Sequence, residues 1–115
     1  MDLIFTCLAD SPVLLRNNTG QGNAWIGFEL VGSKSNRDGI GARLTLRAGT
    51  QRSVRWITGG SSYLSSSDKR VVFGVLPGLP SASLDLEIVW PSGTVQHVED
   101  LTDFRYHRIV EPNPR

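Results

Sequence analysis

Apolar and polar residues alternate along several short segments of this chain, and this period of two is that of a strand with one buried face. Ile26, Phe28 and Leu30 share one face of the first such segment. Residues 84–90 give the longest example, with leucine, isoleucine or tryptophan at every second position. The other predicted strands cover residues 43–47, 53–56, 71–75, 94–99 and 105–111. The pattern predicts an all-β domain, an antiparallel β-sandwich or partly open barrel of about seven to eight short strands.

Two hairpins follow from the turns between these segments. The Pro-Ser-Gly sequence at 91–93 suits a tight turn, because proline fits its first central position and glycine the following left-handed one. A second hairpin joins the segments at 43–47 and 53–56, and its alternation separates an apolar face from a face of arginines. We expect Trp56 and Trp90 on the apolar faces of their strands, and therefore in the core.

Length, composition and charge exclude several classes of protein. The chain has 115 residues, 39% of them hydrophobic and 20% charged, which fits one folded domain. Its 12 basic and 11 acidic residues leave a net charge of +1, so electrostatics give no reason to expect nucleic acid as a partner. Cys7 is the single cysteine and cannot close an internal disulfide, and no cysteine–histidine spacing indicates zinc.

Four short motifs lie in the turns and strand starts between residues 22 and 93. Two of them are specific in combination, namely the loop Gly-Ser-Lys-Ser-Asn-Arg-Asp-Gly-Ile-Gly-Ala-Arg at 32–43 and the Trp-Pro-Ser-Gly hairpin at 90–93. The other two are a Gly-Asn-Ala-Trp-Ile entry at 22–26 and a Ser-Ser-Tyr-Leu-Ser element at 61–65. Together the four motifs resemble the ASPIC/UnbV domain, over about residues 23–103. The serine run at 65–67 and the basic character near Arg52 and Arg55 depart from the family pattern. The resemblance implies a β module found at the C-terminus of exported proteins.

The first residues of the chain carry a second resemblance. Asp-Leu-Ile-Phe at 2–5 and Pro-Val-Leu-Leu-Arg-Asn at 12–17 are similar to the end of an FG-GAP propeller repeat. We therefore divide the chain into a propeller-strand remnant and linker at 1–18 and a β domain at 19–115. The family implies a preceding propeller domain in a longer parent protein and an extracellular or periplasmic location. This chain itself shows no signal-peptide pattern and no apolar stretch of the roughly 18 to 20 residues that span a bilayer.

The glycine-rich loop admits two interpretations. Oxygen-bearing side chains recur at Ser33, Asn36 and Asp38, which would suit a calcium ion, with Asn36 and Asp38 as the candidate metal ligands. The EF-hand pattern is not met. In the alternative, Asn36 and Asp38 cap the loop through side-chain-to-backbone bonds, while Gly39 and Gly41 adopt conformations that other residues avoid.

Arginine and aromatic side chains are the candidate ligand-binding groups. We expect Arg43, Arg47 and Arg55 on one outer face, where Arg37 can join them to dock an acidic glycan or protein. In the alternative, these arginines pair across strands with nearby carboxylates, each pair contributing about 0.2 to 1 kcal/mol. Trp25 and Tyr63 are candidate sugar contacts, because Trp25 falls on the outer face of its strand and Tyr63 falls in a loop.

The residues do not assemble into a predicted catalytic site. Ser92, His97 and Asp100 supply the residue types of a triad, but Ser92 lies in a hairpin turn without a nucleophile-elbow sequence. Glu87 and Glu99 are present, but nothing sets the separation that a glycosidase needs. We therefore predict a non-catalytic extracellular module, without cofactor, that packs on a propeller and binds protein or glycan. A calcium-dependent adhesion domain using residues 33–39 and a glycan-active hydrolase are the alternatives, and exposed strand edges favour self-association.

Overall fold

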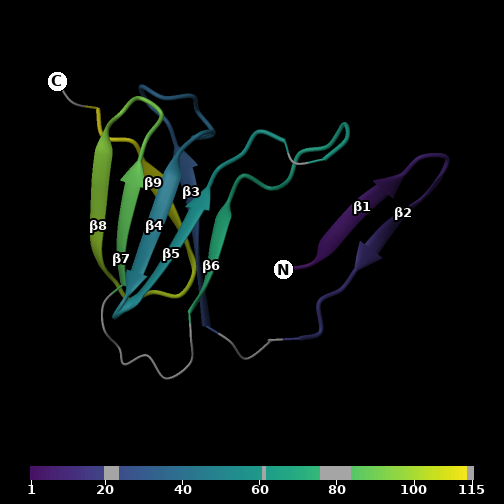
Figure 1. Ribbon diagram of the computed structural model, residues 1–115, viewed down its shortest axis with the longest axis horizontal. Helices are drawn as coiled ribbons and strands as arrows, with labels where there is room; N and C mark the ends of the chain where they lie inside the picture. The colour runs from purple at the N-terminus through teal and green to yellow at the C-terminus, as the bar shows by residue number, and fades with distance from the viewer. Residues whose placement is uncertain (20–23, 61, 76–83, 114–115) are drawn as a thin grey trace.

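The computed structural model describes residues 1–19, 24–60, 62–75 and 84–113, which form nine strands and no helix. The all-β prediction is confirmed (Figure 1). No helix in the described part of the chain is long and apolar enough to cross a membrane. Three features of the sequence analysis cannot be placed, because they touch residues outside the described ranges. They are the predicted domain boundary near residue 19, the start of the 22–26 motif, and Ser61. In chain order the strands are β1 (Leu3–Cys7), β2 (Asp10–Leu15), β3 (Ala24–Val31), β4 (Arg43–Ala48), β5 (Gln51–Trp56), β6 (Val71–Val75), β7 (Leu84–Val89), β8 (Val95–Leu101) and β9 (Tyr106–Val110).

Two sheets form the body of the domain, and a separate hairpin precedes them. One sheet has the strand order β6–β3–β9 and the other the order β5–β4–β7–β8, while β1 and β2 form a two-stranded sheet. Every pairing is antiparallel except that of β3 with β9, which is parallel. The chain leaves one sheet after β8 and crosses to the other through residues 102–105, so that β9 runs beside β3 in the same direction (Figure 1).

The core lies between the two sheets and is built from the inward positions of the alternating segments. Phe28 from β3 and Phe73 from β6 are fully buried, with their ring centroids 5.9 Å apart. Trp90 is also buried, as predicted, and its indole N–H donates to Oε1 of Gln96 at 2.9 Å. Burial of this polar group is therefore compensated by a hydrogen bond. The other large side chains that are fully buried are Ile26, Leu44, Leu86 and Ile88.

The alternation along β5 has the opposite phase to the one predicted. Arg55 pairs in register with buried Leu44 and so lies on the inner side of the sheet, its guanidinium 5.6 Å from the centroid of the Phe73 ring. Trp56 pairs with Arg43 on the outer side and is 59% exposed, so the prediction that it belongs to the core is wrong. A period of two does not say which face is inward. At this edge the long arginine can cover apolar surface while its head stays near water.

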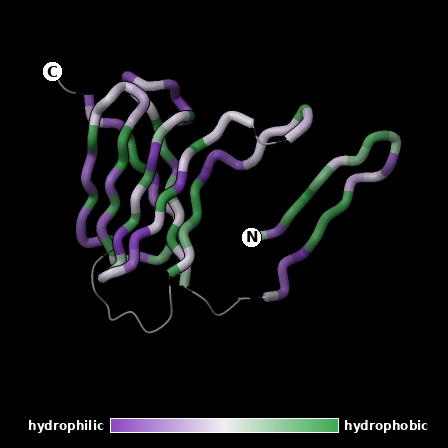
Figure 2. The backbone as a smooth tube through the Cα atoms, viewed as in Figure 1, coloured by the Kyte–Doolittle hydropathy of each residue, from purple (hydrophilic) through white to green (hydrophobic). Residues whose placement is uncertain are grey.

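The β1–β2 hairpin has no core of its own. Figure 1 shows it apart from the two sheets, and Figure 2 shows hydrophobic residues along both of its strands. Ile4 and Leu14 face each other across the strands and are each 68% exposed. On the other face, Leu3 pairs with Leu15 and both are exposed. Isolated two-stranded hairpins are marginally stable in water. The exposed apolar side chains of this hairpin therefore lack the packing partners that a stable strand pair needs.

Candidate functional site

A buried carboxylate, Glu111, organises the loop that follows β3. Because β3 and β9 are parallel, both strands end at the same edge, and the Glu111 N–H donates to the Val31 carbonyl at 2.8 Å. Its side chain is therefore directed at the start of the loop. The carboxylate oxygen Oε2 accepts bonds from the backbone N–H groups of Ser33, Lys34 and Ser35, at 2.9, 2.8 and 2.7 Å.

The second oxygen of Glu111 connects the loop to the turn between β7 and β8. Oε1 accepts from the hydroxyl groups of Ser35 at 2.9 Å and Ser92 at 2.6 Å. The Ser92 N–H in turn donates to Oγ of Ser35 at 3.1 Å. Glu111 is only 2% exposed, and burial alone would raise its pKa. The hydrogen bonds from Ser92, Ser35 and Ser33 outweigh that effect and lower the pKa to about 2. The carboxylate is thus an ionised link between three segments.

Sequence reasoning did not single out Glu111. Its hydrogen-bond partners in the loop lie 76 to 78 residues earlier in the chain. No local pattern marks such a residue, because its role depends on the parallel pairing of β3 with β9.

The rest of the loop makes the bonds of the capping interpretation at Asn36. Its side-chain amide donates to the Ile40 carbonyl at 2.8 Å, and its oxygen accepts from the Ile40 N–H at 2.9 Å. Gly39 and Gly41 have φ values of 68° and 96°, in the region that favours glycine. Asp38 is exposed, and no described residue contacts its side chain through a hydrogen bond or ion pair. Within the described ranges no three potential ligands among histidine, cysteine, aspartate and glutamate gather.

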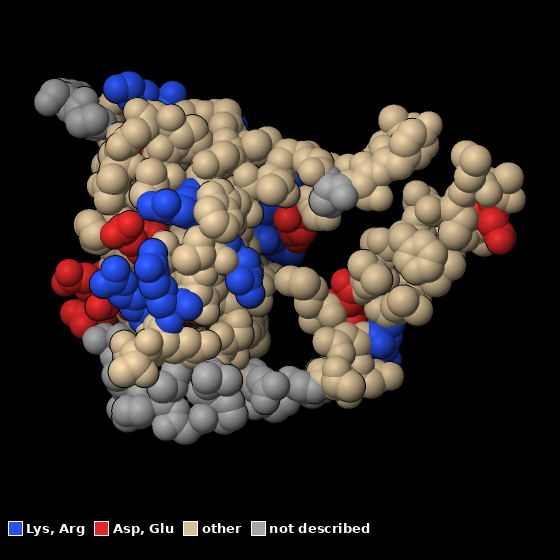
Figure 3. All heavy atoms as spheres, in the orientation of Figure 1, with Lys and Arg blue, Asp and Glu red and all other residues tan. Residues whose placement is uncertain are grey.

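Three arginines form a row on the outer face of β4 and β5, which we call the arginine strip: Arg43, Arg47 and Arg52. All three are exposed, and Arg47 lies directly opposite Arg52 in the pairing of the two strands. Exposed Trp56 continues the strip beside Arg43. Figure 3 shows this basic patch on the face turned to the viewer, with acidic side chains toward β8. Arg52 thus takes the place on this face that we had predicted for Arg55.

Carboxylates lie next to the arginine strip but do not neutralise it. Asp85 on β7 is level with Arg47, and Glu87 is level with Thr45. Neither forms an ion pair, since the ion pairs among the described residues are Arg70–Asp68 and Arg105–Asp103. The predicted cross-strand charge pairs are therefore not made within the described part of the chain. The face is divided instead into a basic half on β4 and β5 and an acidic half on β7 and β8.

The remaining candidate ligand groups lie elsewhere on the surface. Trp25 is on the outer face of the other sheet, 39% exposed, with its ring centroid 5.0 Å from that of Tyr106. Gly27 makes room for this pair, because a Cβ there would lie 2.4 Å from the Tyr106 ring. Tyr63 is 83% exposed in a turn beyond β5, and Arg37 is exposed in the glycine-rich loop. The structure therefore does not bring Trp25, Tyr63 and Arg37 together with the arginine strip.

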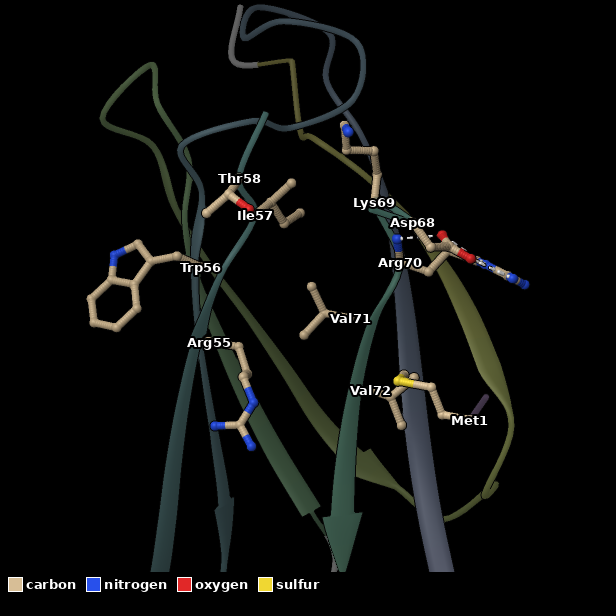
Figure 4. A pocket seen from close by; sticks show the side chains of 10 residues that line it. All are labelled: Met1, Arg55, Trp56, Ile57, Thr58, Asp68, Lys69, Arg70, Val71 and Val72. Atoms are coloured by element: carbon tan, nitrogen blue, oxygen red, sulfur yellow. Dashed lines mark hydrogen bonds and ion pairs between the residues drawn. The ribbon is translucent and has the colours of Figure 1, made fainter. Parts of the chain in front are cut away.

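A groove of about 380 Å³ opens where edge strands β5 and β6 diverge (Figure 4). Arg55 and Val71 point into it, whereas the Trp56 ring points away. At its rim, Arg70 pairs with Asp68 at 2.7 Å and lies 4.3 Å from the centroid of the Tyr106 ring. The groove is therefore lined by apolar and charged side chains together, and an ion pair lies at its rim.

The candidate catalytic residues are dispersed. The Ser92 hydroxyl donates its single proton to the Glu111 carboxylate at 2.6 Å, and the Thr94 hydroxyl lies 3.1 Å from its oxygen, so the proton is directed at a structural partner. His97 is exposed on β8, level with Glu87. No described hydrogen bond connects Ser92 with His97. The arrangement of these residues is that of a stabilised turn.

Comparison with known proteins gives one family. The model of the family described as ASPIC and UnbV matches residues 32–115 of the chain, which include the Glu111-linked loop and the arginine strip. No curated protein and no solved structure matches.

Proposed function

Because this chain belongs to the ASPIC and UnbV family, we propose that it is a non-catalytic β module that docks on a propeller domain of its parent protein and binds a further molecule outside the cytoplasm. The observation that carries the docking is the apolar β1–β2 hairpin. The resemblance of its sequence to the end of an FG-GAP repeat supports a propeller as the docking partner. The same resemblance supports an extracellular or periplasmic location.

Both faces of the hairpin are apolar, and this favours a position between two layers of β structure. One face carries Ile4 and Leu14, and the other carries Leu3, Phe5 and Leu15. A strand pair at the surface of a sandwich would alternate apolar with polar residues, whereas strands covered on both sides are apolar throughout. The blades of a propeller are stacked in this way around a central axis. The hairpin therefore suits the addition of strands to such a blade.

The test substitutes the most exposed cross-strand pair of the hairpin, with the double variant Ile4→Ser, Leu14→Ser. We expect the unmodified chain to bind a hydrophobic fluorescent dye and to self-associate, and the variant to lose both properties. Its thermal unfolding midpoint should stay within about 2 °C, because the pair contributes little to the sandwich core. The control is Val110→Ser, which removes an exposed valine from β9 and should leave dye binding unchanged. Equal dye binding by the double variant and the unmodified chain would argue against an uncovered docking surface.

A further inference from the structure

We propose that the arginine strip binds an acidic polysaccharide laid along β4 and β5, with its carboxylate or sulfate groups on Arg43, Arg47 and Arg52 and a sugar ring against Trp56. This inference deepens the proposed function, because it specifies the further molecule that the docked module binds, and it rests on that function only for its biological setting.

The uncompensated positive charges of the strip favour binding of an anion. Arg47 and Arg52 are directly opposite on adjacent strands, an arrangement that destabilises a sheet when the charges are alike. Neither forms an ion pair with any described residue. An anionic group between the two guanidinium groups would remove their repulsion and accept bonds from both. Arginine suits this role because its planar donors match the geometry of carboxylate and sulfate oxygens.

The spacing of the charges suits an extended polymer better than a single small anion. Arg43 and Arg47 are four residues apart on one strand, which places them about 13 Å apart at the usual rise per residue. Arg52 adds a second charge at the Arg47 end. A chain with repeated acidic groups can therefore occupy both ends of the strip at once, and each contact raises the effective concentration of the next.

Trp56 gives the strip an uncharged contact surface beside its charged groups. It is 59% exposed beside Arg43 and its ring points away from the β5–β6 groove. An exposed tryptophan offers a large rigid apolar face with a polar edge. The C–H groups on one face of a pyranose ring can pack on such a surface while the acidic group of the same unit reaches Arg43.

The acidic half of the face sets the direction of the ligand. Asp85 and Glu87 on β7 would repel an anion that crossed the sheet, so a polyanion must run parallel to β4 and β5. The strip also offers only three cationic side chains, whereas nucleic-acid binding depends on many phosphate contacts. A polysaccharide with spaced charges fits this narrow strip better than a polyphosphate backbone.

The test measures affinity of the full chain for four probes by isothermal titration calorimetry at constant salt. The probes are a heparin oligosaccharide, an oligogalacturonate, a neutral dextran and a thymidine oligonucleotide of similar length. We expect at least one of the two acidic saccharides to bind and the dextran and oligonucleotide to bind at least tenfold more weakly, roughly the factor of one charged contact. Which acidic saccharide binds shows whether sulfate or carboxylate is the recognised group.

Four variants assign the binding to the strip. The double variant Arg47→Gln, Arg52→Gln should lower affinity by about tenfold or more, and Trp56→Ala by about fivefold, since these remove charged and stacking contacts respectively. Arg108→Gln is the matched control, because it removes an exposed arginine from β9 on the other sheet and should change affinity less than about twofold. Asp85→Asn should strengthen binding by removing repulsion.

Several outcomes would overturn the inference. These are no binding of either acidic saccharide, an equal loss in the Arg108 control, or oligonucleotide binding as tight as saccharide binding. Repeating the titration with Ile4→Ser, Leu14→Ser separates the two proposals. Saccharide affinity should be unchanged in that variant, so a failed docking test and a failed binding test are distinguishable.

Discussion

Glu111 and the arginine strip are both charged, but they differ in burial and in the number of partners that compensate the charge. Glu111 is almost fully buried and accepts hydrogen bonds from five donors in two segments. The strip arginines are exposed and have no ion-pair partner among the described residues. A charged group whose hydrogen bonds are all made inside the protein stabilises the fold, and it has no free hydrogen-bonding position for a ligand. A charge that is left unpaired beside a like charge costs stability, so it is the better candidate for binding.

The largest expected effect comes from removing the carboxylate of the buried region. Glu111→Ala leaves the backbone N–H groups of Ser33, Lys34 and Ser35 without their acceptor. We expect a loss of about 3 kcal/mol in unfolding free energy, since each unsatisfied buried donor costs about 1 to 3 kcal/mol and water can reach part of the loop. Urea denaturation measures this loss. Unchanged stability would show that the loop does not depend on Glu111.

Acid should weaken the same region without any substitution. The folded-state pKa of Glu111 is about 2, below its ordinary value of 4.5. Because the pKa is lowered, the ionised link stabilises the fold above pH 4.5, and this contribution disappears as the pH falls toward 2. The shift corresponds to about 3 kcal/mol. Stability measured between pH 6 and pH 2 should fall less steeply for Glu111→Gln, which has no carboxylate to titrate. Parallel curves for the two proteins would contradict the assignment.

A smaller effect is expected at Asn36, and it also tests the calcium alternative. Asn36→Ala removes both bonds to Ile40 and should cost about 1 kcal/mol in calcium and in EDTA alike. Asp38→Ala should change unfolding free energy by less than about 0.5 kcal/mol in either buffer, because it is an exposed surface substitution. Thermal unfolding in both buffers provides the measurement. A loss that occurs only with calcium present would restore the metal interpretation of the 33–39 loop.

The smallest effect has the opposite sign and concerns the strip. Arg52→Glu replaces a like-charge pair by an opposite-charge pair with Arg47. We expect a gain of about 0.2 to 1 kcal/mol in unfolding free energy together with weaker saccharide binding. Arg108→Glu on the other sheet serves as the control, where no such gain is expected. A loss of stability in Arg52→Glu would mean that the two guanidinium groups are already compensated within the fold.

The sequence predicts strands more reliably than the faces and partners of those strands. The alternation around Phe28 and Trp90 identifies core strands, because deep burial on one face leaves a clear period of two. At β5 the same pattern fails, since an edge strand tolerates Arg55 on its inner side and Trp56 on its outer side. Asn36 could be predicted as a cap because its partner is four residues away. Glu111 could not be, because its role arises from a parallel strand pairing that no local pattern encodes.

The parallel pairing of β3 with β9 has a kinetic consequence. The two strands are separated by most of the domain, so the pair closes a very long loop, and such contacts slow folding. At a synthesis rate of about 5 to 20 residues per second, roughly 4 to 15 seconds pass between the completion of β3 and the appearance of β9. During that time one edge of β3 is unpaired and the Glu111-linked loop has no anchor. Until β9 and Glu111 have been synthesised, the exposed edge of β3 is therefore open to pairing with the wrong strand.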